Sequence, residues 1–289
     1  MILVTGATGQ LGRKTIDFLL EKTSPQNMGA LVRDTAKGAE IAAKGVELRQ
    51  GDYNDYPSLV NAFRGVDKLY FVSGNDIPNR GQQHQNVVNA AKEAGVGHVF
   101  YTSFQRKNES LSSPIAMVAK SHIDTENLLK ASGLNYTILK HGLYMEMLPA
   151  FMGDKVLETG VIFLPSGEGK AAYTAREDMA EAAATLLTTD GHENKAYEIS
   201  ANGSWSWHDI AATLNALSGK AISYVSPTPE VYKAELSKAG VPDMYVGIFA
   251  SFGEAIRQGE FDITDPTLEN LLGRKTTSPR DFLKAVYGL

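Results

Sequence analysis

The feature that most constrains the fold is a glycine-rich segment near the start of the chain, Gly6-Ala7-Thr8-Gly9-Gln10-Leu11-Gly12. It follows a short apolar run at residues 2–5, which predicts a buried strand, and it opens an amphipathic helical pattern at residues 11–22. In this context Gly6 would permit a tight turn, Gly9 the close approach of a pyrophosphate, and Gly12 close packing of helix on strand. The free N–H groups of the helix N-terminus would bind the phosphates, with Thr8, Gln10 and Leu11 as further contacts. The segment therefore predicts a dinucleotide site.

Apolar runs and helical patterns then alternate regularly, which predicts βαβ units and a doubly wound, Rossmann-type parallel sheet. The apolar runs are continuous rather than alternating, as is typical of strands buried on both faces. Right-handed crossovers would place helices on both sides of the sheet. We expect strands at residues 2–5, 30–33, 46–49, 69–73, 99–103 and 136–139, and helices at residues 11–22, 59–63, 83–94 and 116–131.

The alternation stops after about residue 148. A helix is expected at residues 178–187, a strand at 196–201 that returns to the sheet, a helix at 207–217, and mostly helical structure at 230–258. The predicted division is an α/β dinucleotide-binding domain at residues 1–150 and a smaller, mostly helical substrate lobe at 151–289, with the active site between them.

Composition excludes several function classes. The net charge of −5 argues against direct binding to nucleic acid or an anionic membrane. The absence of cysteine excludes disulfides, thiolate metal sites and a cysteine nucleophile, and it agrees with a cytoplasmic location. We expect no signal peptide and, without an apolar run of about 18 residues, no transmembrane helix. No metal is expected, because His141, His192 and His208 lack a second ligand at a suitable spacing.

The residues at the predicted strand ends indicate the cofactor. Arg33 ends the second strand, where an acidic residue would hold the ribose hydroxyls of NAD and an arginine accommodates the 2′-phosphate of NADP. NADP(H) is therefore predicted. Further cofactor contacts are expected at the carboxyl ends of the next three strands: Asp52, Tyr53, Ser73, Gly74, Thr102 and Ser103.

Together the glycine segment, Val32-Arg33-Asp34, Gly51-Asp52-Tyr53, Tyr101-Thr102-Ser103 and His141-Gly142-Leu143-Tyr144 resemble the NmrA-like branch of atypical short-chain dehydrogenases. Residues 190–197 and the Leu271-Leu272-Gly273 segment are similar to bacterial NADPH-dependent quinone reductases and triphenylmethane dye reductases of that branch. The resemblance covers essentially the whole chain. It implies a Rossmann domain, a small substrate lobe, and NADP(H) in the cleft between them.

One departure from the wider dehydrogenase pattern restricts the chemistry. That pattern places Tyr-x-x-x-Lys on the helix after the fifth strand, whereas here Ala116 precedes Lys120. Alanine transfers no proton, so reversible alcohol oxidation and sugar epimerisation are disfavoured. The spacing of Lys120 and Glu126 resembles the lysine-bearing helix of isoflavone-type reductases. The dye reductases differ in carrying His at this place, which leaves dye specificity open.

A quinone or a similar conjugated electrophile needs hydride and an apolar slot, and its product can take a proton from water. Lys120 is the candidate to hold the nicotinamide ribose or to stabilise an oxyanion, and His122 to relay a proton. Gly142 is expected to let the chain pass the nicotinamide. The candidates to line the substrate slot are Phe104, Tyr144 and Met147.

Two alternatives stay open at this stage. A redox sensor would bind NAD(P) without turnover and would control a protein partner, in which case Lys120 would contribute to binding alone. A nucleotide-sugar epimerase is a weaker alternative, because it needs a proton-transfer group where Ala116 stands. The favoured partner is a small quinone-like molecule, and a homodimer is left open.

Overall fold

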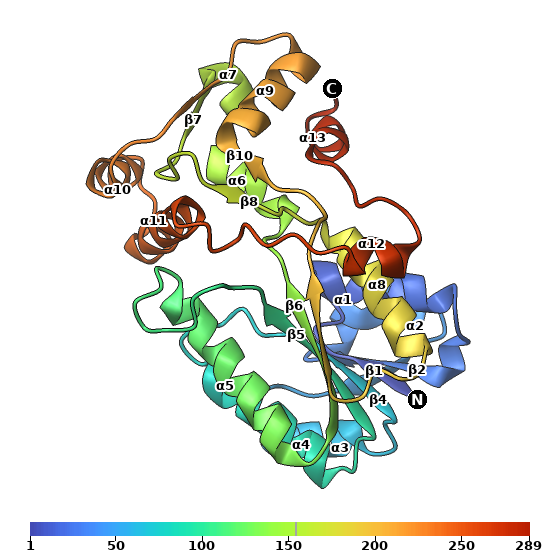
Figure 1. Cartoon of the computed structure of the whole chain (residues 1–289). Helices are drawn as coiled ribbons and strands as arrows, with labels where there is room; N and C mark the ends of the chain where they lie inside the picture. Colours follow the sequence, from blue (N-terminus) through green and yellow to red (C-terminus); the bar gives the residue numbers. More distant parts are fainter. Residues whose placement is uncertain (154) are drawn as a thin grey trace.

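The centre of the molecule is a parallel sheet with the strand order β3-β2-β1-β4-β5-β6-β9 (Figure 1). The computed structural model describes residues 1–153 and 155–289. The order reverses between β1 and β4, and ligands of open α/β sheets bind in the crevice at such a switch point. The strands are β1 (Ile2–Val4), β2 (Met28–Val32), β3 (Glu47–Gln50), β4 (Lys68–Phe71), β5 (His98–Phe104), β6 (Asn135–His141) and β9 (Lys195–Ile199).

Helices cover both faces of this sheet (Figure 1). The face formed by Leu3, Phe71 and Tyr101 packs under α3, α4 and α5, and the opposite face, which includes Tyr70 and Phe100, packs under α1 and α8. Neighbouring residues on one strand are thus buried on opposite faces, which is why the strands read as continuous apolar runs. The helices are α1 (Gln10–Leu20), α2 (Ala39–Ala42), α3 (Tyr56–Phe63), α4 (Arg80–Glu93), α5 (Ala116–Ser132) and α8 (Arg176–Thr188).

The chain leaves this layer after β6 and later returns to it. Helix α8 packs against α1, and β9 pairs in parallel with β6 from Thr137↔Lys195 to His141↔Ile199. Helix α12 (Thr267–Leu272) then packs on α8 and β9. These segments cover the outer edge of β6, which would otherwise expose unpaired backbone groups. Residues 176–199 therefore belong to the body of the sheet domain.

The remaining segments form a second lobe above the carboxyl ends of the strands (Figure 1). Its core includes the buried rings of Phe151, Trp207 and Phe261. Two small pairings, β10–β8 and β11–β7, support the helices. The elements are α6 (Leu148–Met152), α7 (Val156–Thr159), β7 (Val161–Phe163), β8 (Lys170–Ala171), β10 (Trp205–Ser206), α9 (Trp207–Ser218), β11 (Ser223–Val225), α10 (Pro229–Lys238), α11 (Asp243–Arg257) and α13 (Pro279–Tyr287).

The predicted doubly wound parallel sheet is confirmed. The structure adds elements that were not predicted, namely the short strands β7, β8, β10 and β11 and the helices α2, α6, α7, α12 and α13, and several boundaries differ. Helix α3 begins three residues before the expected residue 59, because the Asp55 carboxylate caps the Ser58 amide and Pro57 suits the first turn. The helical segment expected at 230–258 is divided into α10 and α11, since Gly240 adopts a φ of +81° and Pro242 precedes α11. Within the described part of the chain, every helix falls short of the length and apolar character needed to cross a membrane.

Candidate active site

The glycine loop between β1 and α1 forms one wall of the candidate site. Gly6 has a φ of +59°, and a Cβ added to Gly12 would lie 2.4 Å from the Gly6 carbonyl oxygen, so neither position accepts a larger residue without strain. Helix α1 begins at Gln10, and its first turn presents N–H groups that have no helical acceptor. The loop is therefore built as a close-fitting anion site at a helix N-terminus.

A cavity of about 630 Å³ runs along this loop and over the carboxyl ends of the strands. Thirteen of the residues predicted from the sequence line it: Gly6, Thr8, Gly9, Gln10, Leu11, Gly12, Arg33, Asp52, Tyr53, Ser73, Gly74, Tyr144 and Met147. Several lining residues were not predicted, namely Leu31, Val32, Gly51, Asn54, Val72, Asn75, Asp76, Gln83, Glu146 and Arg176. Most of these adjoin a predicted residue in the chain, but Arg176 had no sequence signal, because only the return of α8 to the sheet brings it here.

Arg33 and Tyr53 shape one end of the cavity. Arg33 is exposed at the end of β2, where its guanidinium is free to meet a ligand. The Tyr53 hydroxyl donates to the Val72 carbonyl oxygen at 2.8 Å, and burial raises the pKa of this phenol well above its usual value. Asp52 accepts the Asn54 amide at 2.8 Å and so shapes the turn after β3. A neutral ring held by a hydrogen bond and an exposed cation therefore both line the cavity.

The loop after β4 is held in place by buried side chains. The Ser73 amide donates to Thr102 Oγ1 at 2.8 Å, and the Gly74 amide donates to His84 Nε2 at 3.1 Å. The second nitrogen of His84 lies 2.8 Å from Thr125 Oγ1. Burial, helped by nearby Arg80, lowers the pKa of His84 to about 3, so its ring stays neutral and can accept from the amide. Thr102 thus orients the loop and is not itself among the cavity-lining residues.

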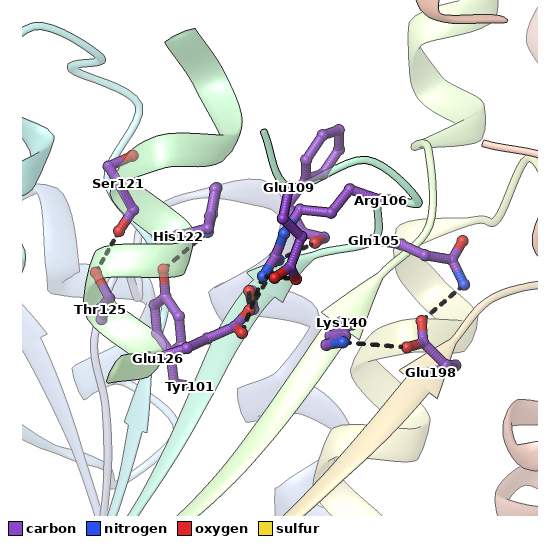
Figure 2. A network of polar contacts seen from close by, with 12 residues as sticks. Tyr101, Gln105, Arg106, Glu109, Ser121, His122, Thr125, Glu126, Lys140 and Glu198 are labelled. Atoms are coloured by element: carbon purple, nitrogen blue, oxygen red, sulfur yellow. Dashed lines mark hydrogen bonds and ion pairs between the residues drawn. The ribbon is translucent and has the colours of Figure 1, made fainter. Parts of the chain in front are cut away.

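His122 lies inside the domain behind this loop (Figure 2). Its Nδ1 lies 2.8 Å from the Tyr101 hydroxyl, and its ring centroid is 5.8 Å from that of Phe104. Burial lowers the pKa of His122 well below its usual value and raises that of Tyr101. Both groups are therefore neutral at physiological pH. His122 does not line the cavity.

Ser103 donates a hydrogen bond to the buried ion pair of Arg106 and Glu126, and these two residues are labelled in Figure 2. The Ser103 hydroxyl donates to Glu126, whose two carboxylate oxygens receive Arg106 at 2.8 and 3.0 Å. Burial alone would raise the pKa of the Glu126 carboxyl, but its bonds from Arg106 and Ser103 hold it below the usual value. Arg106 also donates to the Phe104 carbonyl oxygen at 2.8 Å. The pair therefore fixes the backbone at the end of β5.

Lys120 lies on the outer side of α5. Its side chain is 65% exposed, and its ammonium is 2.5 Å from Asp124 one helical turn away. It is not among the residues that line the cavity. Reaching a bound ligand would require this side chain to leave Asp124.

The predicted substrate residues pack against two different cores: Tyr144 against the core of the sheet, and Phe104 and Met147 against the core of the second lobe. The Tyr144 ring stacks on the Arg176 guanidinium at 4.1 Å, and Phe104 packs on Phe261 with ring centroids 5.5 Å apart. A Cβ on Gly142 would lie 3.1 Å from the Ala172 carbonyl oxygen, so the need for glycine there comes from the approach of the second lobe. Phe104 and Gly142 do not line the cavity, whereas Tyr144 and Met147 do.

The residues that line the cavity suit an elongated ligand that carries negative charge. Its lining combines main-chain donors, polar and charged side chains, and the larger side chains of Tyr144 and Met147. Among the described residues, no three His, Asp or Glu side chains gather in a way that could hold a metal ion. The place of the missing proton-transfer tyrosine is taken by Ala116, the first residue of α5.

Comparison with known proteins finds a family and relatives that match nearly the whole chain. The model of the NmrA-like family matches residues 1–276. Quinone oxidoreductase 2 of Escherichia coli is 38% identical over 289 residues, which cover 100% of this chain and 99% of that protein.

Two solved structures with bound cofactor are similar throughout. An NADPH complex of the NADPH-dependent quinone oxidoreductase from Escherichia coli has a TM-score of 0.94 at 36% identity, covering 99% of this chain and 100% of its own. Triphenylmethane reductase of Citrobacter sp. complexed with NADP(H) has a TM-score of 0.91 at 38% identity, covering 99% of each chain.

Proposed function

The chain belongs to the NmrA-like family, and from this premise we propose that it is an NADPH-dependent oxidoreductase that transfers hydride to a quinone or a similar conjugated electrophile. The observation that carries the proposal is the cavity, whose lining joins a glycine loop that needs Gly6 and Gly12 to Arg33 after β2 and to Tyr144 and Met147 after β6. Relatives similar over the whole chain are named as quinone and triphenylmethane reductases.

The chain's own residues fit NADPH along the length of the cavity. Arg33 would hold the 2′-phosphate, because its guanidinium can donate two charge-assisted hydrogen bonds to phosphate oxygens. The amides at the start of α1 would hold the pyrophosphate. Tyr144 and Met147 would lie beside the nicotinamide, at the end of the cavity remote from Arg33. The cofactor supplies the hydride when bound.

The proposed substrate class follows from the lack of a proton-transferring tyrosine at position 116. A quinone is reduced by hydride at a conjugated ring, and its product phenolate takes a proton from water. Ala116 therefore does not prevent this reaction, whereas it disfavours epimerase chemistry. Phe104, Tyr144 and Met147 would exclude water from the ring and align it through apolar contact. His122, neutral and bonded to Tyr101, is proposed to assist proton transfer behind Phe104.

Quinone-dependent oxidation of NADPH tests the proposal. We expect absorbance of NADPH to fall on adding a benzoquinone or naphthoquinone, with saturation in both substrates. Tight NADPH binding without reduction of any quinone or triarylmethane dye would contradict it and would favour the sensor alternative. That alternative is otherwise not favoured, because the relatives reported above are reductases.

Lys120 is proposed to contribute to cofactor binding or oxyanion stabilisation by moving from Asp124 to the ligand. Lys120→Ala should then lower kcat/KM more than Lys130→Ala, a matched control at an exposed position on the same helix. Equal rates for the two variants would rule out a role for Lys120.

Two further proposals concern the cellular location and the oligomeric state of the protein. We propose a cytoplasmic enzyme, supported by a cysteine-free sequence that has no need of an oxidising compartment. A homodimer is the proposed assembly. Cell fractionation and light scattering of the purified protein test the two statements separately.

A further inference from the structure

Arg176 is a cation in the cavity that the function described so far does not use. It is the first residue of α8 and lines the cavity beside Tyr144 and Met147. Its side chain is only 17% exposed. Because a buried charge is costly unless a partner compensates it, its surroundings indicate what it is there to bind.

The protein partners of Arg176 hold the guanidinium in place but compensate its charge incompletely. Its NH1 donates to Gln10 Oε1 at 2.9 Å and lies 3.5 Å from Glu146 Oε2. Glu146 also accepts the Arg176 backbone amide at 2.9 Å, so this carboxylate serves the helix start as well. The face of the guanidinium packs on the Tyr144 ring at 4.1 Å. A cation is thereby fixed beside the N-terminus of α1, where Gln10 follows the glycine loop.

The cavity lining carries charges of both signs, with Asp52, Asp76 and Glu146 as well as two arginines. Among the lining residues that the structure describes, Arg33 and Arg176 are the cations, and they lie at different places along the cleft. NADPH carries its negative charge in two places as well, on the 2′-phosphate and on the pyrophosphate. The loop offers the pyrophosphate main-chain N–H groups and a helix dipole worth about half a charge, which leaves most of its charge to be met by another group.

We propose that Arg176 binds the pyrophosphate of the cofactor together with the N-terminus of α1, beside Gln10. In the bound state the Arg176 NH groups donate to a phosphate oxygen, and Tyr144 keeps the guanidinium plane oriented. Arg33 and Arg176 then have separate tasks: Arg33 selects NADPH over NADH, and Arg176 contributes equally to the binding of both. The assignment deepens the proposed function, since it rests on NADP(H) as the ligand of this cleft.

Binding measurements without quinone test this division of tasks. The dissociation constants of NADPH, NADH and adenosine 2′-monophosphate are measured by calorimetry for wild type, Arg176→Met, Arg176→Lys and Arg33→Met. Adenosine 2′-monophosphate carries the 2′-phosphate but no pyrophosphate. We expect Arg176→Met to weaken NADPH and NADH alike by about 10- to 100-fold, the loss of a charge-assisted hydrogen bond, and to leave the monophosphate unchanged.

The matched control should give the opposite pattern. Arg33→Met should weaken NADPH and the monophosphate and leave NADH nearly unchanged. Arg176→Lys keeps the charge and should recover most of the affinity that Arg176→Met loses, which separates an electrostatic role from damage to the fold.

Three outcomes would overturn the assignment: wild-type NADPH affinity in Arg176→Met, an equal loss of monophosphate binding in that variant, or no recovery in Arg176→Lys. If the expected binding pattern is found but no quinone is reduced, the assignment of Arg176 stands and the proposed reaction fails.

Discussion

The buried histidine His84 gives a prediction that can be worked out quantitatively. Its ring accepts the Gly74 amide at 3.1 Å and lies 2.8 Å from Thr125 Oγ1, and its side chain is 1% exposed. The ring is neutral in the folded protein because burial lowers its pKa from 6.5 to about 3. We therefore expect His84→Gln to change how the free energy of unfolding depends on pH.

The direction follows from which state binds the proton. Between the folded pKa of about 3 and the unfolded pKa of 6.5, the unfolded chain carries a proton on His84 that the folded chain does not. The stability contributed by the neutral ring is thus present above pH 6.5 and is lost as the pH falls toward 3. Between about pH 7.5 and about pH 5, this proton binding lowers the free energy of unfolding of the wild type by about 2 kcal/mol. It does not lower that of His84→Gln, which lacks the titrating ring.

Urea unfolding at those two pH values measures the effect. At the higher pH, His84→Gln should destabilise the protein by about 1–3 kcal/mol through the disturbed buried hydrogen bonds. At the lower pH its cost should be about 2 kcal/mol smaller. Asn89→Gln, on the exposed side of the same helix, is the control and should show the same pH dependence as wild type. If the cost of His84→Gln is the same at both values, with unchanged m, a neutral His84 in the folded state is refuted.

Three further substitutions test other parts of the structure. Gly12→Ala places a Cβ 2.4 Å from the Gly6 carbonyl oxygen and should abolish measurable NADPH binding in calorimetry; near-normal affinity would show that the loop can yield. Glu126→Gln leaves Arg106, 1% exposed, with Glu109 as its remaining carboxylate and should lower the free energy of unfolding in urea by about 1–3 kcal/mol. A loss below about 1 kcal/mol would contradict a buried ion pair. Phe104→Ala should raise KM for a quinone by about tenfold and leave the dissociation constant of NADPH unchanged, whereas an equal change in both would remove Phe104 from the substrate slot.

The sequence alone determined the parallel sheet and the glycine loop that lines the cavity. Both depend on short-range patterns: apolar runs that become strands buried on two faces, and a Gly6–Gly12 spacing that suits one strand–loop–helix geometry. The carboxyl ends of parallel strands share one edge of a sheet. The sequence therefore predicted that Arg33, Tyr53 and Gly74 lie close together, and all three line the cavity. The regular geometry of strands and helices is the reason that these sequence patterns predict where the residues lie in the fold.

Side-chain direction and long-range returns of the chain were decided by the tertiary structure. Lys120 matched a family spacing, but its orientation on α5 depends on which face of that helix packs on the sheet, and it points to solvent and Asp124. Ser103 and Thr102 end β5 as expected, yet their hydroxyls serve buried partners rather than the cavity. Arg176 carried no local signal at all, because its place beside the start of α1 comes from α8 packing against α1, two helices separated by more than half the chain. Local sequence encodes the conformation of each element, whereas the groups that share a cavity are set by packing between distant elements, which no short pattern contains.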